Sequence, residues 1–249
     1  MQLLIDAGNT RIKWALVNGG AWLGDGAVPV DSADDLPRAV AEHLGNTGVN
    51  PRDIRQIWVS NVAGDEVAQR VLDIDAGQPG QLHFIVARER QCGVRNGYAN
   101  AGQLGSDRWA ALIAAWHLAR RACMVVNCGT AVTIDTLSGH GEFRGGLILP
   151  GPDLMQRSLA GATSQLRPRQ GKYAAFPLNT ADALFSGAIQ ACCGAIERQY
   201  ALLEDDSALV VLSGGAAGIL QEHIKLPLQA VDNLVLRGLL LIASEAGEK

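Results

Sequence analysis

The chain opens with Leu3-Leu4-Ile5-Asp6-Ala7-Gly8-Asn9-Thr10, an apolar strand that ends in an acidic residue, a glycine and a threonine, and residues 11–17 follow as a second strand. The same pattern returns at Met124-Val125-Val126-Asn127-Cys128-Gly129-Thr130, again followed by a strand, over residues 131–135. Asn127 lies 121 positions after Asp6, close to half of the 249-residue chain. This spacing predicts two similar lobes, each of which contributes one such turn.

Each turn has the residues that a phosphate site needs. A glycine lets the backbone approach a phosphate closely, and consecutive amides in a tight turn form an anion-binding concavity. A threonine hydroxyl adds a donor, and the Asp6 carboxylate can hold Mg²⁺ directly or through water. Ordinary hairpins favour the same residue types, so either turn alone would be ambiguous. The repetition at half-chain spacing favours the phosphate interpretation.

Lys13 follows the first turn and has two interpretations. It is either a cation that helps to hold a polyphosphate or a solvated strand residue. The residues themselves leave both interpretations open.

The bulk composition excludes several classes of protein. Hydrophobic residues make up 48% of the chain, charged residues 18%, and the net charge is −4. No basic run is present, so nucleic acid is not expected as a partner. No apolar run reaches the roughly 18 residues of a membrane span, and no signal peptide precedes Met1. The five cysteines fit no zinc spacing and are expected as small core residues, so we expect a cytoplasmic protein.

The order of the predicted elements favours an α/β fold, because strands come first and then alternate with helices. The expected strands cover residues 1–17 as a hairpin, 21–30, 54–61, 82–86, 123–135 as a second hairpin, 145–151 and 209–212. The expected helices cover residues 34–44, 64–72, 106–121, 152–165, 180–203 and 233–246, with a Gly-rich loop at 92–106 and a polar loop at 167–179. We expect two ribonuclease-H-like lobes of the actin, Hsp70 and sugar kinase superfamily, facing a central nucleotide cleft, at residues 1–115 and 116–249.

A third informative stretch is Gly105-Ser106-Asp107-Arg108, at the start of a predicted helix. Ser106 can cap this helix, and the helix dipole should lower the pKa of Asp107 in the first turn. A weak base suffices for phosphoryl transfer, because the carboxylate mainly orients the attacking hydroxyl. Arg108 could bind a carboxylate in bidentate fashion. The alternative is an ordinary helix start with a surface arginine.

Together these stretches make the chain resemble the type III pantothenate kinases, also called the Baf-type pantothenate kinases. Ile5 to Thr10 matches the first phosphate motif of that family, and Asn127 to Ala131 matches the second. Gly105 to Arg108, with Tyr98 upstream, matches the substrate and catalytic motif, and Ser213-Gly214-Gly215-Ala216 resembles the nucleotide-side turn. Residues 145–151 and the segment after them also resemble the family. The order and spacing of these motifs are more specific than any one of them.

The resemblance implies ATP-dependent phosphorylation of pantothenate to 4′-phosphopantothenate, the first step of coenzyme A synthesis, with Mg²⁺. It implies that Asp107 is the base. It implies that ATP is held by Thr130 and by Asp6, Ala7, Gly8, Asn9, Thr10, Arg11, Ile12 and Lys13. It places around pantothenate Tyr98, Gly105, Ser106, Asp107 and Arg108, with Arg108 as a partner for the substrate carboxylate.

The resemblance also implies a homodimer, in which Thr180 of one subunit helps to complete the substrate pocket of the other. From the residues alone Thr180 is equally a helix N-cap, because Asn179-Thr180 opens the long predicted helix. Small residues along that helix permit close approach of another helix, from a partner or from the same chain: Gly187, Ala188, Ala191, Cys192, Gly194 and Ala195.

One residue departs from the family pattern. The family usually has Asp where this chain has Asn127, and in relatives that Asp helps to bind an activating monovalent cation, K⁺ or NH₄⁺. An amide oxygen can coordinate K⁺ without supplying negative charge, which predicts weaker cation binding. The candidate metal ligands are therefore Asp6 and Asn127, with Asp6 carrying more of the Mg²⁺ binding.

Two other functions are compatible with paired phosphate turns. Another small-molecule kinase or phosphatase of the superfamily would share the turns but would not be expected to share residues 105–108. A nucleotide-binding regulatory protein without turnover is the second alternative. The absence of a basic patch argues against direct DNA binding, and the intact Asp6 and Asp107 favour catalysis.

Overall fold

The computed structural model describes residues 1–47, 50–74, 82–162, 170–205 and 207–247. The chain divides into two compact units, one formed by Met1–Ala114 with Leu234–Lys249 and the other by Ala115–Asn233. This division leaves the last helix with the first unit, whereas the predicted lobes of residues 1–115 and 116–249 placed it with the second. The boundaries of the lobes stay a prediction.

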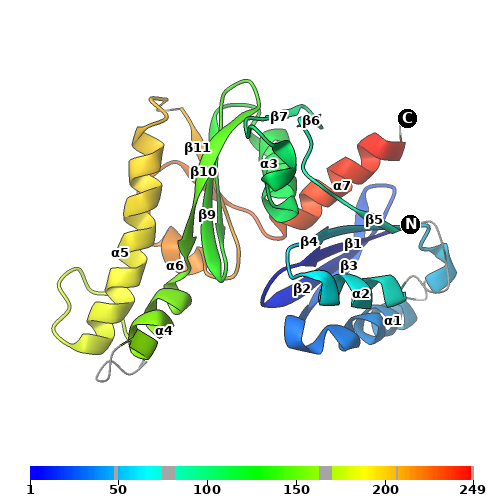
Figure 1. The fold of residues 1–249 in the computed structure, drawn as a ribbon, viewed down its shortest axis with the longest axis horizontal. Helices are drawn as coiled ribbons and strands as arrows, with labels where there is room; N and C mark the ends of the chain where they lie inside the picture. The colour runs from blue at the N-terminus through cyan, green and yellow to red at the C-terminus, as the bar shows by residue number, and fades with distance from the viewer. Residues whose placement is uncertain (48–49, 75–81, 163–169, 206, 248–249) are drawn as a thin grey trace. The chain divides into compact units, whose positions relative to one another are not determined.

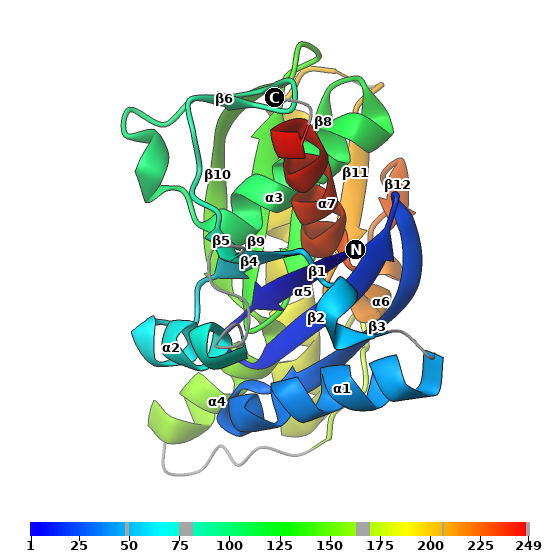
Figure 2. The ribbon, with the colours of Figure 1, turned by 90° about the vertical axis from the view of Figure 1, so that its right-hand side faces the viewer.

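The first unit contains a sheet in the order β3-β2-β1-β4-β5. Its strands are β1 (Gln2–Ala7), β2 (Arg11–Asn18), β3 (Ala21–Pro29), β4 (Gln56–Asn61) and β5 (Leu82–Phe84). The chain of this unit also includes a short hairpin outside that sheet, formed by β6 (Arg90–Gln91) and β7 (Val94–Asn96). Its helices are α1 (Leu36–Thr47), α2 (Asp65–Ile74), α7 (Leu234–Gly247) and the first part of α3 (Ser106–Ala119), with 3₁₀ turns at Val30–Asp35, Pro51–Asp53 and Ala101–Gln103. In Figures 1 and 2, α1 and α2 cover one face of this sheet and α7 lies on the other.

The second unit contains strands in the order β12-β11-β8-β9-β10. The strands are β8 (Cys123–Cys128), β9 (Ala131–Leu137), β10 (Glu142–Pro150), β11 (Leu209–Ser213) and β12 (Leu228–Ala230). The helices are α4 (Pro152–Ala162), α5 (Thr180–Ala201) and α6 (Ala217–Gln221). The long helix α5, yellow in Figure 1, runs beside the sheet and packs on α4 and α6.

The five strands of the first sheet and the five strands β10, β9, β8, β11 and β12 of the second unit follow the same topology. In the first unit β3-β2-β1 are antiparallel neighbours and β1-β4-β5 are parallel neighbours. In the second unit β10-β9-β8 are antiparallel and β8-β11-β12 are parallel. Parallel neighbours need a crossover, which α2 supplies between β4 and β5 and α6 between β11 and β12. This duplication confirms the α/β class with two ribonuclease-H-like lobes that the paired turns predicted.

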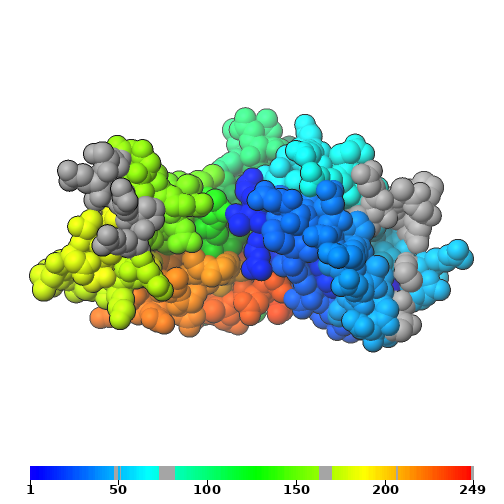
Figure 3. All heavy atoms as spheres, turned by 90° about the horizontal axis from the view of Figure 1, so that it is seen from below, coloured from blue at the N-terminus to red at the C-terminus, as the bar shows by residue number. Residues whose placement is uncertain are grey.

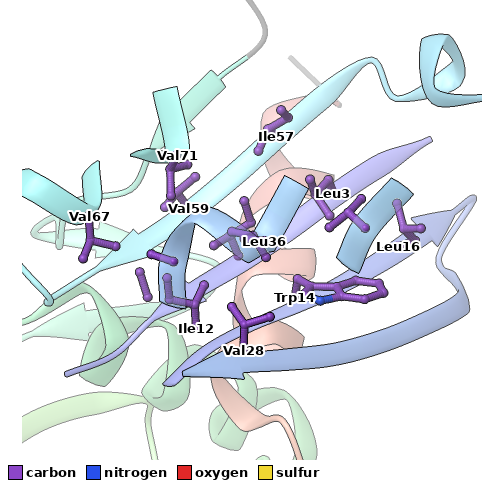
Figure 4. Packing of buried hydrophobic residues seen from close by; sticks show 14 of the residues in the cluster. Leu3, Ile12, Trp14, Leu16, Val28, Leu36, Ile57, Val59, Val67 and Val71 are labelled. Atoms are coloured by element: carbon purple, nitrogen blue, oxygen red, sulfur yellow. The ribbon is translucent and has the colours of Figure 1, made fainter. Parts of the chain in front are cut away.

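The core of the first unit fixes the strand ends that carry the first turn. Alternate residues of β1, namely Leu3, Ile5 and Ala7, lie in one buried cluster with residues of α1 and α2. Figure 4 shows Leu36 of α1 and Val67 of α2 pointing toward these strands. Because such interiors are close-packed, the ends of β1 and β2 have little freedom to move.

The core of the second unit lies between α5 and its sheet, and cysteines form part of it. Ile189, Cys192 and Ile196 of α5 contact residues of β8, β9 and β11. All five cysteines are buried, which confirms their predicted role in the core. Burial raises the pKa of Cys123 and of Cys128 to about 12, so both remain thiols at neutral pH.

The predicted elements agree with the structure except at short segments. Strand β6 directly precedes the segment predicted as a Gly-rich loop, residues 92–106, and β7 lies within it. Strand β12 was not predicted. Residues 163–169, at the end of the fourth predicted helix and the start of the polar loop, lie outside the described residues. Across the described part of the chain, no helix combines the length and hydropathy needed to cross a bilayer.

Candidate active site

The first turn is closed by a backbone hydrogen bond and stands on the core. The Gly8 amide donates to the carbonyl of Arg11 at 3.1 Å, and a Cβ at Gly8 would lie 3.3 Å from that same oxygen. Ala7 and Ile12 are fully buried, so their side chains belong to the core. The exposed residues of the turn are Asn9, Thr10 and Arg11.

Asp6 lies next to the end of β1, between two polar neighbours. Its register partners are Lys13 on the antiparallel strand β2 and Ser60 on the parallel strand β4. Burial, and then the negative charge of Asp107, raise the pKa of Asp6 to about 7, while the positive charge of Lys13 opposes the rise. Lys13 therefore acts electrostatically on Asp6. A divalent cation would stabilise the ionised form of a partly buried carboxylate that is close to a second carboxylate.

Asp107 sits in the first turn of α3, held by backbone contacts. The Gly105 carbonyl accepts the first helical bond, from the Trp109 amide at 3.0 Å, and Asp107 Oδ1 accepts from the Arg108 amide at 2.8 Å. A Cβ at Gly105 would lie 2.7 Å from Asp107 Oδ1. Burial raises the pKa of Asp107, opposed by the Arg108 amide and the Arg108 charge. The prediction of a lowered pKa was wrong, because burial outweighs the favourable helix start.

The Ser106 hydroxyl turns toward β4 rather than toward its own helix. Its Oγ lies 2.9 Å from Ser60 Oγ and donates to the carbonyl of Asn61 at 3.4 Å. The prediction that Ser106 caps α3 through its side chain was therefore wrong. Ser60 was missed in the sequence, although a serine that ends a buried strand is a signal that could have found it.

Arg108 is buried against Tyr98 and is 7% exposed, so the alternative of a surface arginine was wrong. Its Nη1 donates to Tyr98 Oη at 3.2 Å, and its guanidinium carbon lies 5.9 Å from the Tyr98 ring centroid. Asn96, which the sequence reasoning missed, accepts from the Tyr98 amide at 3.0 Å and donates to the Ala101 carbonyl at 3.2 Å. The structure thus brings Tyr98 to the helix start that carries residues 105–108.

The second turn belongs to the other unit and is built on glycine contacts. The Gly129 amide donates to the Ala131 carbonyl at 2.9 Å, and the Gly151 amide donates to the Thr130 carbonyl at 2.8 Å. A side chain at Gly151 would overlap the Gly129 carbonyl, and one at Gly214 would overlap the backbone of Cys128. Gly151, at the end of residues 145–151, and the turn after Ser213 therefore both pack on residues 128–130.

The start of α5 decides between two interpretations of Thr180. The N-cap is Asn179, whose Oδ1 accepts from the Asp182 amide at 3.0 Å. Thr180 is instead the first helical residue and is exposed. The N-cap alternative for Thr180 was therefore wrong, and its side chain is available for another role.

Comparison with known proteins gives one consistent family. A family model described as type III pantothenate kinase matches residues 2–202. The chain is 47% identical over 246 residues to the type III pantothenate kinase of Aromatoleum aromaticum, covering 98% of each chain. It is 45% identical to that of Nitrosospira multiformis, over 99% of this chain and 92% of the relative.

Solved structures agree on the fold. A Baf family protein from Campylobacter jejuni matches with a TM-score of 0.64 at 20% identity, covering 99% of this chain and 100% of that one. The ROK hexokinase of Thermus thermophilus matches with a TM-score of 0.51 at 17% identity, covering 99% of each chain. At these identities the likeness concerns the fold alone.

Proposed function

Because the chain belongs to the type III pantothenate kinase family, we propose that it transfers the γ-phosphate of ATP to pantothenate, forming 4′-phosphopantothenate in the first step of coenzyme A synthesis. The observation that carries the proposal is the grouping of two carboxylates, Asp6 and Asp107, with the buried guanidinium of Arg108 in one unit. Family membership also favours this activity over a regulatory protein without turnover and over another small-molecule kinase.

ATP is held by residues 6–13 and Thr130 in this proposal, with Mg²⁺. The oxygen donors and raised pKa of Asp6 fit a divalent cation, which would favour the ionised carboxylate. Among the residues that the structure describes, no group of three or more His, Cys, Asp or Glu side chains could hold a metal. Asp6 would hold the ion, and Mg²⁺ would, when bound, neutralise charge on the transferring phosphoryl group.

Asp107 orients the substrate hydroxyl and takes its proton. The hydroxyl oxygen of pantothenate attacks the γ-phosphorus, and the bond from that phosphorus to the bridging oxygen of ADP breaks. The proton passes to the Asp107 carboxylate. The raised pKa of Asp107 suits this role, because a carboxylate with a higher pKa is a stronger base and accepts a proton more readily. Tyr98 and residues 105–108 surround pantothenate, and Arg108 binds its carboxylate.

The active enzyme is a homodimer in this proposal, with Thr180 completing the partner's substrate pocket. Phe176 and Leu178, just before α5, are 91% and 98% exposed. Their segment is tied to α5, since the Lys172 amide donates to Asp182 Oδ1 at 2.7 Å and the Ala174 amide to Ser186 Oγ at 3.0 Å.

The surface of α5 adds to the support for a dimer. Gly187, Ala191 and Gly194 are exposed along α5, whereas Ala188 and Cys192 are buried in its own unit. The yellow segment leading into α5 lies at the surface in Figure 3. Large exposed apolar side chains beside a helix face of small residues suit contact with a second copy.

The monovalent cation and the compartment are further parts of the proposal. Asn127 occupies in β8 the position that Asp6 occupies in β1, so a K⁺ or NH₄⁺ ion there would meet an amide oxygen instead of a carboxylate. We therefore expect that a monovalent cation activates this protein more weakly than it activates relatives that have Asp at this position. The buried cysteine thiols suit the reducing cytoplasm.

The proposed activity is tested with purified protein, ATP and Mg²⁺, with and without pantothenate, in K⁺, NH₄⁺ or Na⁺. ADP release is measured together with the mass of the phosphorylated product. Turnover that requires pantothenate and disappears in Asp107→Asn is expected. A folded, ATP-binding protein without pantothenate turnover in every cation would contradict the proposal.

A further inference from the structure

We propose that Ser60 is a positioning residue of the kinase, whose hydroxyl fixes the start of α3 and thereby the carboxylate of Asp107. This inference rests on the proposed function. Ser60 lies next to the end of β4, is 0% exposed, and its Oγ is 2.9 Å from Ser106 Oγ. Ser106 immediately precedes Asp107, so a shift of this contact would move the base itself.

Ser106 Oγ has two hydrogen-bond partners, and the one supplied by Ser60 is the closer. Either hydroxyl can be the donor in the 2.9 Å bond between Ser60 Oγ and Ser106 Oγ, and Ser106 Oγ can also donate to the Asn61 carbonyl at 3.4 Å. Without the Ser60 hydroxyl, Ser106 would keep a 3.4 Å contact to Asn61 and lose the shorter bond that fixes its rotamer.

The contact connects the elements that carry the two acidic residues of the site. Ser60 and Asp6 are register partners on the parallel strands β4 and β1, and the Val62 amide donates to the Ala7 carbonyl at 3.0 Å. The end of β4 is thereby fixed to the strand that carries Asp6. Ser60 extends this frame to α3, which carries Asp107, so one hydroxyl ties together the elements that present both carboxylates.

The turn after Ser60 is itself held in place. Asn61 Oδ1 accepts from the Ala63 amide at 3.0 Å, and Asn61 Nδ2 donates to the Gly64 carbonyl at 2.9 Å. The Val62 side chain lies 3.8 Å from where a Cβ of Gly105 would be. The Ser60 contact therefore belongs to a hydrogen-bonded turn, residues 61–64, that packs beside residues 105–107.

The duplicated topology supports a functional role for this position. In the second unit Asn127 pairs with Ser213 on the parallel strand β11, just as Asp6 pairs with Ser60 on β4. Ser213 begins the Gly-Gly turn that packs on the second phosphate turn. The chain thus has a serine at the same register position in both units, and in the first unit it is bonded to the helix of the base.

The test compares Ser60→Ala with Ser60→Cys, Ser60→Thr and a control, Ser138→Ala. Ser138 is buried and accepts from the His140 and Glu142 amides in a turn of the other unit. Ser60→Ala is expected to lower kcat roughly tenfold to a hundredfold, since small misplacements of reacting groups have effects of this size. The KM for ATP should change little, and Ser60→Thr should restore part of kcat. The control should lose stability without losing kcat.

A second readout does not depend on turnover. The carboxyl titration of Asp107 in ligand-free protein is followed by ¹³C NMR and assigned with Asp107→Asn. Ser60→Ala should shift this titration, and Ser138→Ala should not. If the Asp107 titration and kcat of folded Ser60→Ala both match the wild type, Ser60 has a structural role alone and the inference is wrong. Should Ser60→Ala fail to fold, Ser60→Cys carries the same test. If the wild type does not phosphorylate pantothenate, the proposed function fails, and the titration still decides the role of Ser60.

Discussion

The negative charge of Asp107 raises the pKa of Asp6, although one residue lies at the end of β1 and the other at the start of α3. Asp107 makes the ionised form of Asp6 less favourable, and burial disfavours the ionised form of both carboxylates. Such a pair is costly to keep fully ionised in the ligand-free protein. Mg²⁺ would compensate this repulsion, so nucleotide binding and the protonation of the site should be linked.

The first prediction concerns the pH dependence of stability. Asp6 has an ordinary pKa of 3.8 when unfolded and about 7 when folded, so between these values the folded protein binds more protons. Its contribution to the free energy of unfolding is therefore present at low pH and is lost as pH rises toward 7, by about 1.4 kcal/mol per pH unit. Asp6→Asn should remove this loss, as urea unfolding from pH 4 to 8 would show. A constant stability difference between wild type and variant would contradict the assigned pKa.

The second prediction concerns the base. Asp107→Asn should lower kcat by about 10² to 10⁴, the usual range for a general base. The fold and ATP binding should remain, because an amide oxygen can still accept from the Arg108 amide. The same variant should lower the pKa of Asp6, since it removes a charge that raises it. Single-turnover kinetics and carboxyl NMR measure the two effects, and a variant with most of its activity would disprove the assignment.

The third prediction concerns the monovalent cation. Asn127→Asp places a carboxylate beside Thr133 and Ser213 in the second unit, at the position that Asp6 has in the first. The added charge should reduce the K⁺ or NH₄⁺ concentration for half-maximal activity by roughly tenfold. Activity is measured against cation concentration, with tetramethylammonium keeping ionic strength constant. An unchanged response would mean that this position does not contact the cation.

The fourth prediction separates catalysis from helix capping at the start of α5. Asn179→Ala removes the N-cap and should cost about 1 kcal/mol of stability with little change in the KM for pantothenate. Thr180→Ala should leave stability nearly unchanged and raise that KM roughly threefold to tenfold, the effect of one lost hydrogen bond. Thermal unfolding and steady-state kinetics give both numbers. The reverse pattern would remove Thr180 from the substrate pocket.

The sequence was most informative where local pattern and function coincide. The repeated strand, turn and strand around Asp6 and Asn127 predicted the duplicated fold, because glycine and alternating apolar residues directly encode hairpins. The short strands β6 and β12 were not predicted, since pieces of two or three residues have no readable period.

The errors at the site have a common physical cause. The helix start at Asp107 predicted a lowered pKa, but burial by distant parts of the chain decides its direction. The hydroxyl of Ser106 was expected to cap its own helix, yet Ser60, far away in sequence, binds it. Both outcomes depend on tertiary contacts that no local pattern contains.

The fifth prediction concerns the contact between α7 and α3, the helix that carries Asp107. Gly238 of α7 lies against α3, and a side chain there would overlap the carbonyl of Ala110. Ala110 follows Asp107 by one helical turn, so Gly238→Ala must displace either α7 or the helix of the base. We expect a loss of about 1 to 3 kcal/mol in stability, typical of overpacking, together with a lower kcat. Gly45→Ala in α1, which meets nothing within 4 Å, is the matched control and should be neutral or slightly stabilising. Urea midpoints and kcat measured on both variants would decide, and equal behaviour of the two would contradict the close contact of α7 with α3.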